Sequence, residues 1–389
     1  MKVLILAPNI DIMGGANVLV FKIARHLASK GDEVQIWSNF FYSNKRSIEN
    51  ALFIRNIGKE FSDVIILKRM LGILSYLTLP AESNTFDIMF CHNFPSYFST
   101  LSSNFNGRPT IWQCNEPSIV LYPLPTEALH PSAFDNPSFT IPQNILRKID
   151  RLAVSRITQI AVLSQYAKNR VKLVYDRDSE IIRLGVDTNR FNPSYNGDDI
   201  RTLHGITNRP CILTVGRLEK RVDLVLKAIA TVKKVIGTVV YIIAGPCDDP
   251  GIELRLRNQI KQLRLESNVI FTGAISNELL PHYYASCDIF VFPQPHWSWG
   301  LTAIEAMSTG KPVIVPDRSG ISEIILDGVN GIKIPIENTE LLAKAMITLL
   351  EDETMRRNMG TLAREYVVKH LQESQFLDKY YELLKKLVI

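Results

Sequence analysis

The chain has 389 residues, of which 46% are hydrophobic and 21% are charged, and its formal net charge is +5. This length fits two domains of average size, each able to bury its own core. No apolar run approaches the roughly 18 residues that a membrane-spanning helix needs. The five cysteines form no Cys-x-x-Cys pair, so we expect free thiols and a cytoplasmic location.

The first half of the sequence alternates short apolar runs with helical patterns. Apolar residues recur at helical spacing from Val18 to Leu27, and the pattern stops at Gly31, which predicts a helix after the first strand. The segment 114–143 holds six prolines and little periodicity, so it is predicted to be a long loop, and such loops are usually functional. Strands are predicted at residues 2–7, 34–37, 87–91, 110–113 and 160–163.

The second half repeats this alternation more regularly. Strands that alternate with helices predict a parallel sheet covered by helices on both faces. Because each half has its own set, the sequence predicts two doubly wound α/β domains, joined by a linker at 191–208 that is rich in residues that break helices and strands. The predicted elements are strands at 211–215, 239–244, 269–272, 289–292 and 312–315, and helices at 222–235 and 301–307.

The turn after the strand at 211–215 has the residues that a diphosphate needs. Gly216 ends the strand, and Arg217 and Lys220 lie between it and the next helix. A guanidinium, a lysine ammonium and the free N–H groups of a helix N-terminus together suit a diphosphate. The alternative is that the two cations are solvated surface groups.

A second candidate site follows the strand at 289–292. Gly300 allows the backbone to approach a ligand closely, and Leu301 and Thr302 open a helix whose N–H groups can hold a phosphate. Glu305 lies one turn further along, where a carboxylate can accept hydrogen bonds from a ribose diol. The alternative is an acidic residue that complements the helix dipole.

Two further candidates lie in the first half. Gly14 and Gly15 form a tight turn after the first strand, which can bring backbone close to a phosphate, although the Gly-x-Gly-x-x-Gly fingerprint is absent. Asn115 and Glu116 are polar groups at the end of another strand, and His92 ends a third in the same way. A histidine in such a place is more often structural than catalytic.

A basic segment extends from Arg147 to Arg183, with nine basic residues against four acidic ones. It is either a set of solvated helix faces or a surface that binds anionic lipid. Nucleic-acid binding is not expected, since no module of aromatic and basic residues appears. Asp176 and Asp178 form an Asp-x-Asp pattern, but they precede a predicted strand, so we interpret them as a surface turn and expect no metal site.

Taken together, these motifs resemble glycosyltransferase family 4, a group of retaining enzymes with the two-domain GT-B fold. The resemblance covers nearly the whole chain and is strongest from residue 184 to residue 336. The matching segments are Leu184–Asp187 with Arg190 and Phe191, Gly216–Asp223, Ala244–Pro246, Phe292 and Pro293, Gly300, Glu305–Met307, Gly310–Val313 and Ser319–Glu323.

The resemblance implies two Rossmann-like domains that face a cleft. Residues 1–192 would form the acceptor-side domain, residues 193–365 would bind the nucleotide sugar, and a helix in 366–389 would cross back to the first domain. The reaction would be retaining transfer from a nucleotide-diphosphate sugar to a glycan or lipid-linked acceptor. No metal or other cofactor would take part. Independently of the resemblance, binding of the basic segment 147–183 to anionic lipid would place the protein on the inner face of the membrane.

The resemblance also implies roles for individual residues. Arg217 and Lys220 would hold the diphosphate and stabilise its negative charge as it leaves. Glu305 would bind the ribose, and Gly15 would approach the donor phosphate. Asn115 stands where many relatives carry a histidine that contacts the sugar or the acceptor.

One departure from the family motif leaves alternatives open. The family has Glu, seven residues and Glu; Glu305 is the second, but Trp297 stands at the first, which usually contacts the donor sugar. The leading interpretation is a hexosyltransferase that uses GDP-mannose or a UDP-sugar, and a faint resemblance of 112–117 to mannosyltransferase relatives favours mannose. A GT-B nucleotide-sugar epimerase and a non-catalytic homologue that binds nucleotide sugars are the alternatives.

Overall fold

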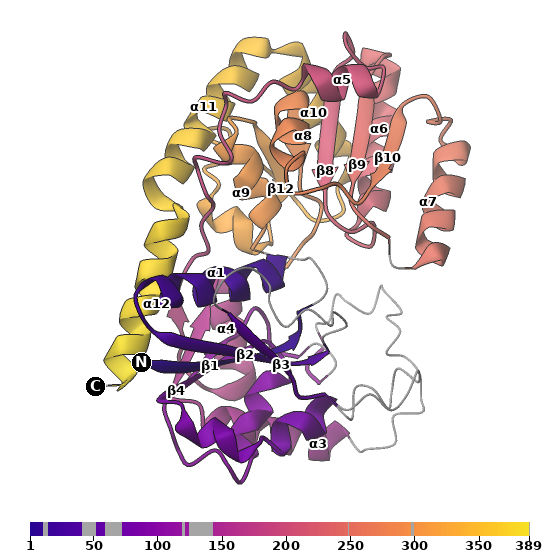
Figure 1. Ribbon diagram of the computed structural model, residues 1–389. Helices are drawn as coiled ribbons and strands as arrows, with labels where there is room; N and C mark the ends of the chain where they lie inside the picture. Colours follow the sequence, from indigo (N-terminus) through magenta and orange to yellow (C-terminus); the bar gives the residue numbers. More distant parts are fainter. Residues whose placement is uncertain are drawn as a thin grey trace. The chain divides into compact units, whose positions relative to one another are not determined.

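The chain divides into two compact units in the computed structural model (Figure 1). The first unit is Met1–Arg183 with Leu377–Ile389, and the second is Leu184–Phe376. The residues that the structure describes are 1–10, 15–40, 52–58, 72–118, 121–123, 143–247, 249–296 and 299–388.

The first unit is built on a seven-stranded sheet in which every pair of neighbours is parallel, in the order β3-β2-β1-β4-β5-β6-β7. The central strands β1 and β4 are buried on both faces, which explains their nearly continuous apolar sequences. The strand order reverses between β1 and β4, and ligands of doubly wound folds bind at such a point. The strands are β1 (Lys2–Asn9), β2 (Glu33–Phe40), β3 (Phe53–Asn56), β4 (Ile88–His92), β5 (Thr110–Gln113), β6 (Gln159–Val162) and β7 (Glu180–Ile181).

Helices and aromatic side chains cover this sheet. Trp37, Tyr97, Phe98 and Trp112 are fully buried in its core. The ring of Tyr97 lies 4.3 Å from that of Trp112, so aromatic packing supplies much of the buried apolar area. The helices are α1 (Gly15–Ser29), α3 (Gln143–Ser155) and α4 (Gln165–Tyr175), with short 3-10 helices η1 (Ala81–Thr85) and η2 (Ser96–Leu101).

The second unit has a six-stranded parallel sheet in the order β10-β9-β8-β11-β12-β13. Its order reverses between β8 and β11, as in the first unit between β1 and β4. The strands are β8 (Cys211–Val215), β9 (Val240–Ala244), β10 (Val269–Gly273), β11 (Ile289–Val291), β12 (Val313–Pro316) and β13 (Ile332–Ile334).

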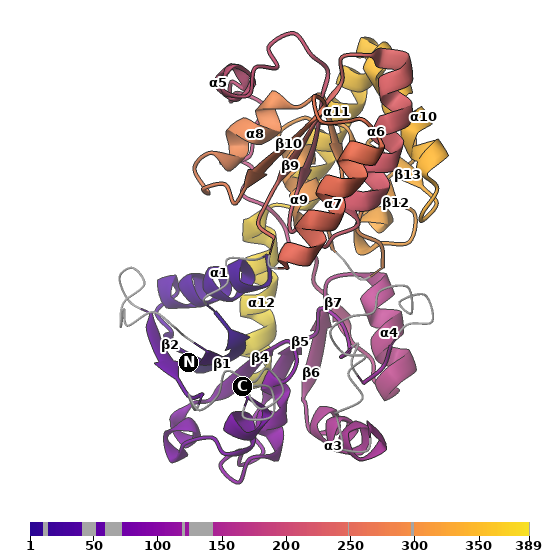
Figure 2. The same ribbon diagram turned by 90° about the vertical axis from the view of Figure 1, so that its right-hand side faces the viewer.

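Helices pack on both faces of the second sheet (Figure 2). Helices α6, α7 and α10 pack together on one face, while α9 packs with α11 and α8 with α5. Apolar side chains of α6 and α10, such as Ile229 and Met346, are fully buried against the sheet. The helices are α5 (Asp198–Leu203), α6 (Val222–Ile236), α7 (Pro250–Gln262), α8 (Leu280–Ser286), α9 (Leu301–Ser308), α10 (Thr339–Glu351) and α11 (Glu353–His370), and the 3-10 helix η4 is Gly320–Ile324. Helix α12 (Glu373–Val388) begins in this unit and belongs to the first unit from Leu377 on.

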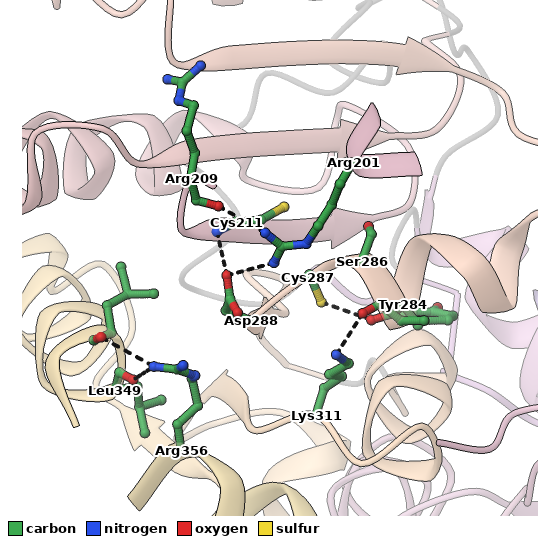
Figure 3. A network of polar contacts seen from close by, with 12 residues as sticks. Arg201, Arg209, Cys211, Tyr284, Ser286, Cys287, Asp288, Lys311, Leu349 and Arg356 are labelled. Carbon is green, nitrogen blue, oxygen red and sulfur yellow. Dashed lines mark hydrogen bonds and ion pairs between the residues drawn. The ribbon is translucent and has the colours of Figure 1, made fainter. Parts of the chain in front are cut away.

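A polar network holds the amino ends of β8 and β11, at the edge of the sheet opposite to the carboxyl ends of the strands (Figure 3). Asp288 accepts hydrogen bonds from the Cys211 backbone N–H (2.8 Å) and from Arg201 Nη2 (3.0 Å). Lys311 Nζ donates to the carbonyl of Ala285 at 2.8 Å. Hydrogen bonds to charged groups stabilise a fold by about 1.5–3 kcal/mol each, so this network holds the two strands at the reversal in register.

The units differ from the predicted domains at their boundary. The predicted linker 191–208 contains α5 and buries Ile200 and Ile206, so it is part of the second unit. The division precedes Leu184 rather than following residue 192, because the carbonyl of Leu184 accepts a 2.7 Å hydrogen bond from Trp299 Nε1. Residues up to Phe376 stay with the second unit, where the backbone N–H of Val186 bonds to the carbonyl of Leu371.

Candidate active site

Two of the predicted sites lie at the same edge of the second sheet. Residues 216–221 follow β8, residues 292–302 follow β11, and these strands are parallel neighbours where the strand order reverses. The carboxyl ends of parallel strands meet at one edge, so the sheet brings together two segments that are about 80 residues apart.

The turn after β8 is held close to the end of β9. Gly216 donates its backbone N–H to the carbonyl of Ala244 at 2.9 Å. Gly245 has φ +157°, and a Cβ there would lie 2.0 Å from the carbonyl oxygen of Gly216, so no side chain fits. Lys220 lies over this strand end: its Nζ is 3.9 Å from the position a Cβ on Gly216 would take.

Arg217 and Lys220 form a concentration of positive charge at this edge. Burial lowers the pKa of Lys220, and the nearby charge of Arg217 lowers it further, while Glu219 partly offsets both effects. Both side chains are half-buried, and like charges held close together repel each other, a repulsion that a bound anion would reduce. The turn is therefore electrostatically prepared for an anionic ligand.

Arg221 connects this turn to α6 in a strained conformation. Its φ of +57° is in the left-handed region, which costs a non-glycine residue about 1–2 kcal/mol. Its guanidinium bonds to Glu337 (Nη1 to Oε1, 2.8 Å) and contacts Asp223 (Nε to Oδ1, 3.4 Å). The side chain is only 17% exposed, so these ion pairs help to offset the strain and hold the residue after Lys220 in place.

The N-terminus of α9 provides the second half of the site. Gly300 precedes the helix with φ +75°, and a Cβ there would lie 2.9 Å from Cβ of Ile321, so glycine is required for two reasons. Leu301 and Thr302 are half-buried in the first turn. The first N–H groups of a helix have no acceptor within the helix and carry partial positive charge, which suits a phosphate.

Glu305 is buried one turn into α9, with 8% of its surface exposed. The hydroxyl of Tyr284 donates a 2.6 Å hydrogen bond to Oε2 of Glu305. Burial raises the pKa of Tyr284, and the nearby carboxylate raises it further, so the phenol remains a donor. Tyr284 could not be singled out from the sequence, because a tyrosine in a short helix that packs on a sheet resembles an ordinary core residue.

In the first unit, the predicted residues Asn115 and His92 belong to one hydrogen-bonded group. The backbone N–H of Asn115 donates to Oδ1 of Asn93 at 3.4 Å, and Asn93 Nδ2 lies 3.3 Å from Nε2 of His92. Asn115 also accepts a 3.0 Å hydrogen bond from Nε2 of Gln113, which the sequence did not single out. Glu116 is half-buried next in the chain.

Of three other residues predicted to bind the donor, the structure describes only Gly15. Gly15 begins α1, the next helix along the chain after β1, which lies at the reversal of the first sheet. Gly14 and Trp297 lie outside the described residues. Their predicted roles stay predictions.

Comparison with known proteins assigns the chain to a family. The model of glycosyltransferase family 4 matches residues 13–190, and that of glycosyl transferases group 1 matches residues 198–366. The chain is a member of the group 1 and family 4 glycosyltransferases. This confirms the predicted family.

This glycosyltransferase is similar in sequence to several named proteins. It is 31% identical over 193 residues to a sulfoquinovosyl transferase of Arabidopsis thaliana (48% of this chain, 36% of that one). It is 30% identical over 164 residues to the alpha-D-kanosaminyltransferase of Streptomyces kanamyceticus (42% of each chain). The chain thus spans less than half the length of these two relatives. A D-inositol 3-phosphate glycosyltransferase of Nocardia farcinica is 26% identical over 382 residues, 92% of this chain and 81% of that one.

Solved structures confirm the predicted α/β GT-B fold for this glycosyltransferase. Sucrose-phosphate synthase from Thermosynechococcus elongatus superposes with a TM-score of 0.82 at 18% identity, covering 99% of this chain and 98% of that one. HepE of Anabaena, in complex with UDP and glucose, superposes with a TM-score of 0.79 at 19% identity, covering 99% and 100%.

The Asp-x-Asp pattern of this glycosyltransferase lies at the surface, as predicted. Asp176 ends α4 and forms a 2.6 Å ion pair with Lys172, and Asp178 forms a 2.9 Å pair with Lys168. Both carboxylates are more than four-fifths exposed. Within the described part of the chain, no group of three or more His, Cys, Asp or Glu side chains is arranged to hold a metal ion.

The basic segment 147–183 is largely engaged in contacts within the first unit. Two of its lysines are paired with aspartates, and four arginines donate to backbone carbonyls: Arg147, Arg156, Arg170 and Arg177. Lys148 and Arg151 are exposed on α3, beside Ile145 and Leu152, which are about half exposed. Across the described ranges, none of the helices has the length and hydropathy for a membrane crossing.

Proposed function

We propose that this glycosyltransferase transfers a hexose from a nucleotide-diphosphate sugar to a glycan or a lipid-linked acceptor, with retention of configuration. The observation that supports this most directly is the pair of cations after β8, where burial and then the nearby charge of Arg217 lower the pKa of Lys220. A diphosphate would relieve this repulsion. Its negative charge also increases as the bond to the sugar breaks, so the same pair favours the transition state over the ground state.

The remaining residues of the second unit fit the other parts of a nucleotide diphosphate. The first-turn N–H groups of Leu301 and Thr302 would donate to phosphate oxygens. Glu305, oriented by Tyr284, would accept from the ribose hydroxyls. Gly216 and Gly300 would let the ligand approach the backbone at both strand ends.

In the proposed reaction the bond between the sugar C1 and the β-phosphate oxygen breaks. The acceptor hydroxyl attacks C1 on the face from which the nucleotide leaves, a C1–O bond forms, and the hydroxyl proton passes to the departing phosphate. Arg217 and Lys220 would provide the electrostatic stabilisation that a divalent metal supplies in other transferases, so we propose that no metal takes part.

The donor is proposed to be a UDP-sugar or GDP-mannose. HepE of Anabaena was solved with UDP and glucose, and a related protein of Rhizobium meliloti is named a lipopolysaccharide core biosynthesis mannosyltransferase. A thermal-shift series with UDP, GDP, UDP-glucose and GDP-mannose tests this. Stabilisation by one nucleotide and its sugar is expected. No stabilisation by any of the four would contradict the proposal.

A non-catalytic nucleotide-sugar-binding protein is the second candidate, because Trp297 replaces the first glutamate of the family motif. It would bind the same nucleotide and release none from the sugar nucleotide. Measurement of nucleotide release from UDP-glucose and GDP-mannose, with water taking the place of the acceptor hydroxyl, distinguishes the two candidates.

We also propose that α3 binds anionic lipid on the inner face of the membrane. Lys148 and Arg151 are exposed on this helix, and the half-exposed Ile145 and Leu152 lie three and one positions from them in the sequence. Cations that alternate with apolar side chains suit a helix at a lipid surface. The lipid-linked acceptor would then be found where the enzyme binds.

A further inference from the structure

A chain of side-chain hydrogen bonds in the first unit runs from helix α12 to the end of β5. The hydroxyl of Tyr380 donates to Oε1 of Gln113, and Nε2 of Gln113 donates to Oδ1 of Asn115 at 3.0 Å. Tyr380 and Gln113 are separated by 267 residues and both are buried, with exposed fractions of 1% and 0%. Asn115 is half-buried, so the chain ends at a side chain that a ligand can reach.

This series of hydrogen bonds determines whether the oxygen or the nitrogen of the Asn115 amide forms a hydrogen bond within the protein. A phenol is a good donor, and here it takes the carbonyl end of Gln113, which leaves the NH₂ end of Gln113 for Asn115. Asn115 therefore has its oxygen occupied. The structure gives the nitrogen of this amide no partner among the residues that it describes.

The backbone of Asn115 is fixed from the other side. Its N–H donates to Oδ1 of Asn93, a residue with φ +57° at the end of β4. The side chain of Asn115 is thus held by Gln113 at the end of β5, and its main chain by Asn93, which follows β4.

We infer that Tyr380 and Gln113 are positioning residues that present Asn115 as a hydrogen-bond donor to an oxygen of the sugar or the acceptor. This inference rests on the proposed function. Packing alone does not require the hydroxyl of Tyr380, because its ring already lies 5.6 Å from that of Phe90, edge to face, and phenylalanine would keep this contact. A buried hydroxyl is costly unless it is hydrogen-bonded, so the hydroxyl of Tyr380 is accounted for by its hydrogen bond to Gln113 and not by packing.

Three variants test the inference: Tyr380→Phe, Gln113→Leu and the two combined. Each single change removes one partner of the buried hydrogen bond between Tyr380 and Gln113, and it should lower the melting temperature. The double change removes both partners of this bond, so it should recover much of the lost melting temperature. The affinity for UDP-glucose or GDP-mannose should fall about threefold to tenfold in all three, including the double variant, because none of them orients Asn115. Affinities for UDP and GDP should not change.

Tyr381→Phe is the matched control, since Tyr381 is next on α12 and its ring contacts His26 instead. The inference would be overturned if the affinity of the double variant for the sugar nucleotide recovered together with its melting temperature. It would also be overturned if all three variants bound the sugar nucleotide as tightly as the control.

A ligand-free measurement separates this inference from the proposed function. The Gln113 side-chain NH₂, identified in NMR spectra by its loss in Gln113→Leu, should exchange with solvent slowly in the wild type and faster in Tyr380→Phe. Equal exchange in both would overturn the inference. Wild-type protein that binds neither sugar nucleotide would contradict the proposed function instead.

Discussion

The hydroxyl of Tyr284 donates a 2.6 Å hydrogen bond to the carboxylate of Glu305, and both side chains are buried in the second unit. This bond fixes one oxygen of the carboxylate that is proposed to bind the ribose. Tyr284→Phe should therefore weaken the binding of UDP or GDP about fivefold, because Glu305 loses its orientation but not its charge.

Isothermal titration with both nucleotides checks this prediction. Tyr283→Phe is the control, since the neighbouring Tyr283 bonds to His204 and not to Glu305. Glu305→Gln should weaken binding more than Tyr284→Phe does. If Tyr284→Phe binds as tightly as the control, Glu305 does not depend on this bond.

The left-handed conformation of Arg221 predicts an unusual order of variants. The free energy of unfolding of Arg221→Gly should stay within about 1 kcal/mol of the wild-type value. Glycine adopts φ +57° without strain, which offsets the loss of the ion pair with Glu337. Arg221→Ala loses the ion pair and keeps the strain, so it should be about 1 kcal/mol less stable than Arg221→Gly. Chemical denaturation measures both, and equal stabilities would show that the backbone conformation relaxes.

Membrane binding should depend on the exposed cations of α3. The double variant Lys148→Glu with Arg151→Glu should lose binding to vesicles that contain phosphatidylglycerol, since each basic residue near an anionic surface contributes about 1 kcal/mol. Binding of the wild type should weaken as salt is added. Lys168→Glu with Lys172→Glu is the control, because these lysines are already paired with Asp178 and Asp176. Equal losses, or none, would remove α3 as the binding surface.

Trp297 predicts an altered choice of donor sugar. An indole offers one N–H donor and an apolar face, whereas the family's carboxylate accepts hydrogen bonds from sugar hydroxyls. Trp297→Glu should therefore change the relative rates with UDP-glucose and GDP-mannose while the affinities for UDP and GDP stay the same. Unchanged donor preference and rate would mean that Trp297 only packs.

The strands and the glycine turns could be predicted from the sequence because they depend on local patterns. Strands β5 and β8 have the predicted bounds, and Gly300 directly precedes α9, which begins at Leu301 as predicted. The edge strands β3 and β13, with four and three residues, were missed because such short segments show no clear alternation. Residues 191–208 looked like a linker because their composition of helix-breaking residues hid the short helix α5.

The contacts that orient the candidate site could not be predicted. Tyr284 and Glu305, Arg221 and Glu337, and Gln113 and Tyr380 are separated by 21, 116 and 267 residues. Each pair forms only when the fold brings two elements together, and no local pattern marks either partner. The sequence therefore indicated which groups could bind a nucleotide sugar, while the structure was needed to find what holds them.

The central claim is that Arg217 and Lys220 stabilise the departing diphosphate without a metal. The most direct test measures nucleotide release from UDP-glucose and GDP-mannose, with water as the acceptor of the sugar, in excess EDTA. The proteins compared are the wild type, Arg217→Ala, Lys220→Met and the control Lys227→Ala, which changes an exposed lysine on α6. Burial lowers the pKa of Lys220, so its charge is costly in the folded protein, and Lys220→Met should melt no lower than the wild type. The account predicts full release by the wild type and the control in EDTA, and a loss of at least about a hundredfold in the other two variants. Wild-type release abolished by EDTA, or near-normal release by Arg217→Ala or Lys220→Met, would contradict it.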